Sequence, residues 1–169
     1  SAIPSDHPLN KGMLGMHGNY GPNVNTNECD LLIAIGMRFS DRVTGNVNTY
    51  AKQAKVIHID IDHAEINKNV TVDVPIVGDC KEVLPLLTAL VEKAEHKEWI
   101  ESFARYNAIE HEKVTVKALN PGSGPLLMGE VARKVSEATA NSAILVTDVG
   151  QNQMMSPRYF KYTKPPSIL

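Results

Sequence analysis

The sequence is poor in aromatic side chains and has no excess of either charge. Aromatic residues make up 5% of the 169 residues and hydrophobic residues 43%, which is typical of a folded globular protein rather than a disordered one. The formal net charge is −2, so no basic face predicts nucleic-acid binding. Apolar runs are all much shorter than a membrane span. We therefore expect a cytoplasmic protein with neither nucleic acid nor a membrane as its partner.

Cysteine and histidine are too scattered to predict a metal site. Cys29 and Cys80 are the two cysteines, and the six histidines show neither HxxxH nor CxxC spacing. A disulfide between the two cysteines is one alternative. Two reduced thiols fit a cytoplasmic α/β protein better, and they are our prediction.

Three short apolar runs are typical of buried strands. They are DLLIAIG (30–36), KVIHIDI (55–61) and VPIVGD (74–79). Because the runs are apolar on both faces, they favour a parallel sheet that is covered by helices. The intervals leave room for crossovers, so we expect a short helix before Asp30 and another near NTYAKQA (48–54).

The second part of the chain predicts helices around a linker. Residues 80–94 and 96–114 read as two amphipathic helices, with Asp79 as the N-cap of the first. NPGSGP (120–125) reads as a linker. After the linker, the sequence predicts a helix over 126–140, a buried strand over 142–150 and then a turn that leads into a helix. The predicted domains are a partial α/β domain over 1–117, a linker over 118–125 and the start of a second α/β domain over 126–169.

Candidate ligand residues follow each predicted strand, at the edge where parallel sheets bind ligands. GMRFSDRVTG carries Arg38 and Arg42 between glycines, which suits a phosphate or carboxylate, although a solvated loop with an internal Arg–Asp pair is equally compatible. Asp60 occupies the place of a ribose-binding carboxylate, whereas Asp62 also suits a helix cap. With GDC after the third run, these ends together predict a nucleotide-like ligand.

The segment GMLGMHGNYGPN (12–23) is dense in glycine, which indicates backbone that runs close to something else. His17 could act as a base, but a packing or hydrogen-bonding role is more common for a lone histidine. Met13 and Met16 suit either core packing or contact with a flat ring system.

Four segments carry a family resemblance: IPSDHPLNKGMLGMHG, GMRFSDRVTG, HIDIDHAEINKN and ILVTDVGQNQM. In this order and spacing they resemble the acetolactate synthase (acetohydroxyacid synthase) family of thiamine diphosphate-dependent enzymes. The resemblance implies three α/β domains, of which this chain would hold the later half of the central, Rossmann-like FAD-binding domain and the start of the thiamine diphosphate-binding domain. The central domain would then be truncated at its N-terminal side.

The resemblance also implies an activity for the parent protein. Such enzymes decarboxylate pyruvate and join the hydroxyethyl unit to a second 2-keto acid, pyruvate or 2-ketobutyrate, in branched-chain amino acid biosynthesis. Their cofactors are thiamine diphosphate, Mg²⁺ and FAD, and we expect a homodimer or larger homo-oligomer. The sequence leaves open whether a regulatory small subunit is a further partner. Neither the activating glutamate segment nor a GDG…N magnesium motif is found in this chain, so we expect it to be inactive alone. Alternatives are a glyoxylate carboligase, a pyruvate oxidase or a non-catalytic nucleotide-binding module.

Carried over position by position, the resemblance implies cofactor contacts but no catalytic and no metal-binding residue in this chain. Arg42 and Met16 would also reach the substrate channel. Two departures from the family pattern are Ser40, where many members have Asp, and Asn152, where many have His. The implied cofactor-binding residues are Leu14, Gly15, Met16, His17, Gly18, Gly36, Met37, Arg38, Arg42, Val43, Asp60, Ile61, Asp79, Cys80, Val149, Gly150, Gln151 and Asn152.

Overall fold

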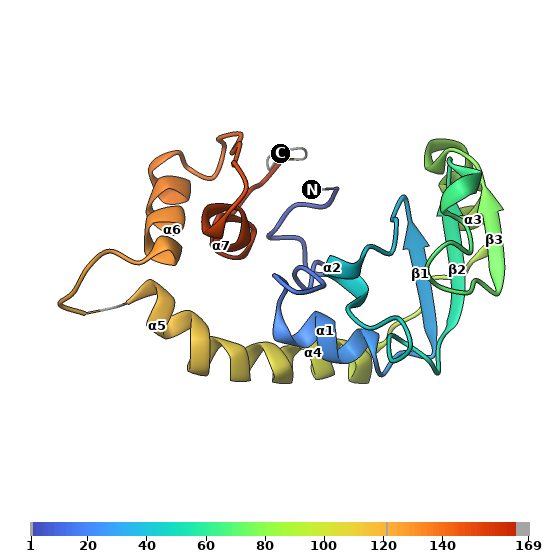
Figure 1. The fold of residues 1–169 in the computed structure, drawn as a ribbon, viewed down its shortest axis with the longest axis horizontal. Coiled ribbons are helices and arrows are strands. Elements are labelled where there is room, and N and C mark those ends of the chain that lie inside the picture. Colours follow the sequence, from blue (N-terminus) through green and yellow to red (C-terminus); the bar gives the residue numbers. More distant parts are fainter. Residues whose placement is uncertain (1, 121, 165–169) are drawn as a thin grey trace. The chain divides into compact units, whose positions relative to one another are not determined.

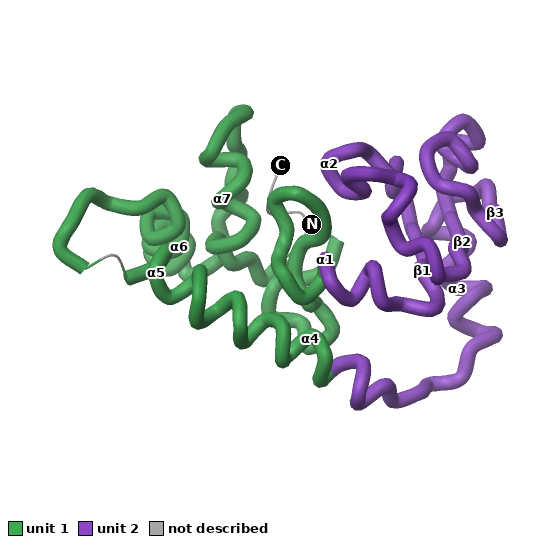
Figure 2. The backbone as a smooth tube through the Cα atoms, turned by 60° about the horizontal axis from the view of Figure 1, so that its bottom comes forward, with its two compact units in different colours: residues 1–22, 101–169 green, residues 23–100 purple. Residues whose placement is uncertain are grey.

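The chain forms two compact units in a computed structural model that describes residues 2–120 and 122–164 (Figure 2). Residues 23–100 make the sheet unit, and residues 1–22 with 101–169 make the helical unit. The unit boundaries fall inside two helices, α1 (Tyr20–Thr26) and α4 (Lys97–Glu110). The domain limits that the sequence predicts, 1–117 and 126–169, stay a prediction.

The sheet unit is built on three parallel strands in the order β1-β2-β3 (Figure 1). They are β1 (Leu31–Ile35), β2 (Lys55–Asp60) and β3 (Val74–Val77). All three apolar runs therefore form strands, as predicted. The parallel sheet with its helices confirms the α/β, Rossmann-like class.

Burial is concentrated in the central strand. Val56 and Ile59 of β2 are buried, whereas Leu31, Ile33 and Ile35 of β1 are between 42% and 46% exposed. The expectation of two covered faces thus holds for β2 and not for β1. Pro75 lies in β3, at the edge of the described sheet, where its missing N–H costs no ladder hydrogen bond on the outer side.

The helices of the sheet unit begin where short acidic side chains can cap them. Asp79 accepts a hydrogen bond from the Lys81 N–H at 2.8 Å at the start of α3 (Cys80–Leu90), as predicted. Asp62 does the same for Ala64 at the 3₁₀ turn η1 (His63–Glu65). The helix α1 confirms the one expected before Asp30. A further short helix, α2 (Asp41–Thr44), lies inside the segment that the sequence analysis treated as a loop.

The helix expected over residues 48–54 is wrong, because this segment forms turns instead. Thr49 donates to the Asn46 carbonyl and Ala54 to the Ala51 carbonyl. Ala51 has a φ of 45°, and a left-handed residue interrupts a right-handed helix. Its N–H is satisfied from outside the segment by Asn27 Oδ1 at 2.9 Å, so the non-helical backbone leaves no orphan donor there.

The helical unit contains one long helical stretch and two further helices (Figure 1). After α4 the chain continues through a π-helical segment, η2 (His111–Thr115), into α5 (Val116–Leu119). This continuous helical stretch ends five residues beyond the helix predicted over 96–114. The first two residues of the predicted linker 118–125 belong to α5, so helix extends into it. Residues 120 and 122–125 lie outside helices and strands, and Pro121 is outside the described residues. The helices α6 (Met128–Ala138) and α7 (Gln151–Tyr159) pack against each other, because Gly129 leaves room for the Tyr159 ring.

The buried strand predicted over residues 142–150 is also wrong. Within it Leu145 makes a single bridge, while Ile144 and Val146 are 64% and 72% exposed. An apolar run becomes a buried strand only when a neighbouring strand pairs with it and helices cover it. The described residues of the helical unit supply no sheet for it to join. Among those residues, no helix has the length and apolarity that crossing a membrane requires.

Candidate functional site

The carboxyl ends of the three strands meet at one edge of the sheet unit. The Gly36 N–H donates to the Ile59 carbonyl at 2.8 Å, and the Gly78 N–H donates to the Asp60 carbonyl at 2.9 Å. The predicted residues at and after these strand ends all lie in the sheet unit. They are Gly36, Met37, Arg38, Arg42, Val43, Asp60, Ile61, Asp79 and Cys80.

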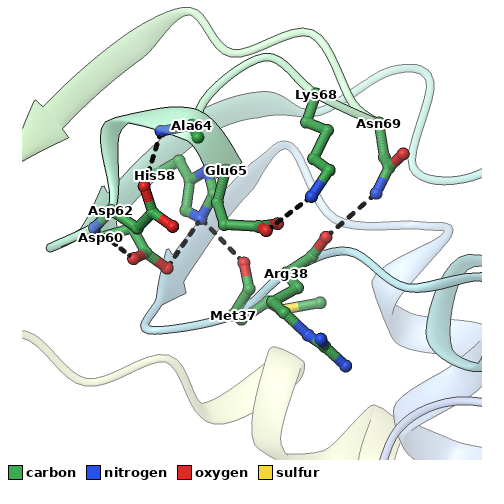
Figure 3. Close-up of polar contacts among 9 residues, drawn as sticks. All are labelled: Met37, Arg38, His58, Asp60, Asp62, Ala64, Glu65, Lys68 and Asn69. Carbon is green, nitrogen blue, oxygen red and sulfur yellow. Dashed lines mark hydrogen bonds and ion pairs between the residues drawn. The ribbon is translucent and has the colours of Figure 1, made fainter.

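The segment after β1 turns sharply and presents arginine side chains. Gly36 has a φ of 59° and Phe39 a φ of 49°, so the backbone is left-handed at both positions. Phe39 is buried, whereas Arg38 is exposed. The Arg38 side chain points away from the polar side chains of His58 and Asp60 (Figure 3). Arg42 is also exposed, at 68% of its side chain, and lies 3.8 Å from the exposed Asp41 carboxylate. Such a pair holds Arg42 only weakly and leaves it able to bind an anion.

Ser40, one of the two departures from the family pattern, occupies the N-cap position of α2. Its side chain makes no capping hydrogen bond, while its carbonyl accepts from the Val43 and Thr44 N–H groups. An Asp at this position could cap the helix with its carboxylate and pair with an arginine. Ser40 carries no charge and therefore cannot form such an ion pair. Val43 is half-buried within this helix.

The acidic residues at the next two strand ends have different surroundings. Asp60 is 8% exposed, and its Oδ1 accepts from the Asp62 N–H at 2.9 Å. Asp79 and Cys80 are exposed at the start of α3, where Asp79 caps the helix. Ile61 is 71% exposed. Asp60 is thus a fixed acceptor, and Asp79 is accessible to a ligand from solvent.

Both cysteines are free thiols, as predicted. Cys80 is exposed, whereas Cys29 is buried and contacts the Thr26 carbonyl at 3.1 Å. Burial raises the pKa of the Cys29 thiol, and the nearby Asp30 carboxylate raises it further. Among the described residues, no group of three or more His, Cys, Asp or Glu side chains could hold a metal ion.

The glycine-dense segment of the helical unit folds back on its own backbone. Asn19 closes it, because its N–H donates to the Met13 carbonyl at 2.7 Å and its Oδ1 accepts from the Met13 N–H at 3.0 Å. A Cβ on Gly18 would lie 2.3 Å from the Met13 carbonyl oxygen, which is far inside contact distance. The high glycine content is therefore explained first by this internal approach.

The predicted cofactor residues of this segment are only partly accessible. Met16 is 64% exposed, Leu14 and His17 are half-buried, and Gly15 and Gly18 are buried. The Nδ1 atom of His17 is buried without a hydrogen-bond partner among the described residues. Met16 is therefore the side chain that this loop offers most openly.

Two charged residues that the sequence analysis missed anchor this segment. Glu110 of α4 is 7% exposed and accepts from the Tyr20 N–H at 3.0 Å and from Asn19 Nδ2. Arg158 of α7 pairs with Glu110 and also donates to the Gly18 carbonyl at 3.0 Å. Both residues border a cavity of about 780 Å³ in the helical unit. No pattern in the sequence marks this pair, because its members are distant from each other and from the loop.

The last predicted site, Val149 to Asn152, forms the turn into α7. Gly150 has a φ of 141° and Val149 is 86% exposed, so this turn is open to solvent. Gln151 is exposed and Asn152 is half-buried. The Asn152 Oδ1 accepts from the Gln153 N–H at 2.9 Å. The Asn152 side chain is therefore already hydrogen-bonded to one of the first backbone N–H groups of the helix. The predicted residues thus divide between the two units.

Comparison with known proteins gives a consistent result. Residues 1–87 match the thiamine pyrophosphate enzyme central-domain family. The chain is 45% identical to a probable acetolactate synthase large subunit from Methanocaldococcus jannaschii, over 99% of this chain and 29% of that protein. It is 39% identical to the acetolactate synthase isozyme 2 large subunit of Escherichia coli, over 99% of this chain and 29% of that protein. It is 40% identical to the chloroplastic acetolactate synthase 1 of rice, Oryza sativa, over 96% of this chain and 26% of that protein. The chain therefore spans less than a third of the length of these relatives.

Proposed function

The chain belongs to the thiamine pyrophosphate enzymes, whose central domain covers residues 1–87, and on this basis we propose that it is part of an acetolactate synthase large subunit. The observation that carries the proposal is the similarity to proteins of that name in an archaeon, a bacterium and a plant, over 96% to 99% of this chain. The proposed reaction of the whole protein is decarboxylation of pyruvate followed by condensation with a second 2-keto acid. When bound, thiamine diphosphate supplies the electron sink that this chemistry requires.

The role proposed for the sheet unit is to bind the phosphates and ribose of FAD. Arg38 and Arg42 fit that group, because both guanidinium groups are exposed. Among the described residues, the one ion pair that either makes is the weak, exposed contact of Arg42 with Asp41. Gly36 and Gly45 lie on either side of them, and a Cβ at either glycine would meet no atom of a described residue beyond its chain neighbours within 4 Å. This open space admits a ligand beside the backbone. Asp60 and Asp79 supply fixed carboxylates at the neighbouring strand ends.

In the helical unit, the loop 14–18 is proposed to contact the flavin through Met16, which is its most exposed predicted residue. Arg42 and Met16 are further proposed to border the channel through which the second 2-keto acid enters. A guanidinium group suits this role because it can bind a carboxylate through two parallel hydrogen bonds.

The turn before α7 is proposed to bind the diphosphate of thiamine diphosphate. Helix N-termini present free N–H groups to anions, and Val149 and Gly150 are exposed there. Mg²⁺ is proposed as a cofactor of the whole protein, with no ligand assigned to this chain. We also propose a cytoplasmic homodimer or larger homo-oligomer, in which a regulatory small subunit could take part.

Two experiments test the proposal. The first is a fluorescence titration of FAD with the purified chain, with ADP as the competitor. Saturable micromolar binding that ADP reduces would support the nucleotide site, and no binding would refute it for this chain. The second is a carboligation assay of the full-length protein with pyruvate and with glyoxylate. Acetolactate formation supports the proposal, whereas tartronate semialdehyde as the main product would identify a glyoxylate carboligase. We expect no acetolactate from the 169-residue chain alone.

A further inference from the structure

The turn that presents Arg38 is held at two consecutive carbonyl groups (Figure 3). His58 of β2 lies 2.8 Å, through its Nε2 atom, from the Met37 carbonyl oxygen. Asn69 donates from its Nδ2 atom to the Arg38 carbonyl oxygen at 3.2 Å. These two carbonyls belong to the peptide groups immediately before and after Arg38. The backbone on both sides of this arginine is therefore fixed, while its side chain stays exposed.

The geometry assigns the proton of the His58 ring. A carbonyl oxygen can only accept, so Nε2 must carry the hydrogen that joins it to Met37. The Nδ1 atom is buried and has no hydrogen-bond partner among the described residues, which suits a bare nitrogen. The side chain is 0% exposed, and Phe39 packs edge-on against it with ring centres 5.0 Å apart. His58 is thus a hydrogen-bond donor in a fixed orientation.

The Asp60 carboxylate contributes to this arrangement without replacing the donor. Its Oδ2 lies 3.8 Å from the His58 Nε2, which is too long for a hydrogen bond. The carboxylate is held by its other oxygen, which accepts from the Asp62 N–H. Its negative charge favours the orientation in which the Nε2–H points toward Met37 and Asp60.

The turn needs such support because its backbone is unfavourable by itself. Phe39 has a left-handed backbone with a φ of 49°, a conformation that residues other than glycine rarely adopt. Without its restraints the turn would sample other conformations, and a ligand would have to order it on binding. Holding a loop in its binding conformation increases affinity by removing that cost.

We propose that His58 and Asn69 are positioning residues that hold Arg38 ready for the phosphate group of a nucleotide ligand. This inference rests on the proposed function, since the ligand that we assign to Arg38 is FAD. It adds that the affinity depends on two side chains that reach the turn from β2 and from the loop before β3 without facing the ligand themselves.

The test uses the 169-residue chain and a thermodynamic cycle for FAD affinity. Asn69→Ala removes one restraint from an exposed side chain, so the variant should fold like its control, Asn48→Ala, which changes an exposed asparagine elsewhere. We expect Asn69→Ala to weaken FAD binding roughly three- to tenfold, and the control to leave it unchanged. In an Arg38→Met background, Asn69→Ala should have no further effect. An equal loss in both backgrounds, or no loss in the first, would refute the inference.

A second pair of variants tests the histidine. His58→Gln keeps an N–H donor near the Nε2 position, whereas His58→Met fills similar space without one. Binding that His58→Gln largely retains and His58→Met loses supports the positioning role. Equal losses would indicate that the two substitutions act on packing alone, and would refute it for His58.

Backbone order separates failure of this inference from failure of the proposed function. In ¹⁵N relaxation measurements, Asn69→Ala should lower the order parameters of residues 37–39 relative to Asn48→Ala. Unchanged order would refute the restraint, whatever the ligand is. If the unmodified chain fails to bind FAD, the proposed flavin site is refuted, and the order parameters still decide whether Asn69 holds the turn.

Discussion

Removal of the Glu110 carboxylate should destabilise the helical unit far more than removal of a neighbouring one. Glu110 is 7% exposed, and the Arg158 side chain that pairs with it is 19% exposed. Glu110→Ala leaves that guanidinium mostly buried without its partner and also frees the Tyr20 N–H. Loss of one member of a buried pair typically costs about 3–5 kcal/mol. Glu112→Ala, two residues away and exposed, should change stability by less than about 0.5 kcal/mol.

Urea unfolding followed by circular dichroism measures this difference, with hydrogen exchange of the Tyr20 amide as a local readout. The local readout is needed because the two units can unfold separately, so that a single transition would not define one free energy. The double variant Glu110→Ala/Arg158→Met should be less destabilised than the sum of the single variants by about 1–3 kcal/mol. If Glu110→Ala matched Glu112→Ala within error, the anchoring role of the pair would be refuted.

Three further predictions concern single residues. Burial, with a smaller effect of Cys29, raises the pKa of Tyr50 to about 12. Because this folded-state pKa exceeds the unfolded value of about 10, the stability that Tyr50 contributes is complete below pH ~10 and is lost toward pH ~12. Phenolate absorbance measures the titration, and a result in which all tyrosines titrate together would contradict this prediction. The hydrogen bond from the Val56 N–H, and then Lys55, lowers the pKa of Asp73. Its stabilisation is therefore complete above the unfolded pKa of about 3.9 and falls as the pH drops below that toward the folded value, so Asp73→Asn should flatten this acid limb in unfolding measurements. Gly18→Ala should lower the free energy of unfolding in urea by about 3 kcal/mol, because the new Cβ meets backbone atoms. Gly45→Ala places its Cβ in open space at a φ of 58° and should lower it by about 1–2 kcal/mol. Equal losses would contradict the steric argument.

Local patterns predicted the sheet unit well. The three apolar runs form the three strands, and Asp79 and Asp62 cap the helix α3 and the 3₁₀ turn η1 that follow two of them. These features depend on side-chain periodicity and on hydrogen bonds between near neighbours, which the sequence contains directly. The candidate residues after the strands also share one edge, because parallel strands end on the same side.

Two local predictions failed for reasons that lie outside the segment. The run over 142–150 is apolar enough for a strand but has no sheet to join among the described residues. Residues 48–54 have helical composition, but the left-handed Ala51 is stabilised by Asn27 from another part of the chain. In each case a partner distant in sequence decides the outcome, and no window of neighbouring residues contains it.

The sequence by itself determined the family, the parallel strands, the helix caps and the places where arginine and glycine gather, because these are properties of short stretches of chain. Only the tertiary structure decided what holds those places in shape. Glu110 and Arg158 support the glycine-dense loop, and His58 and Asn69 restrain the turn at Arg38. Each of these contacts joins residues that chain folding alone brings together. A buried hydrogen bond is formed only where donor and acceptor meet away from water, and residue type and spacing do not specify that meeting.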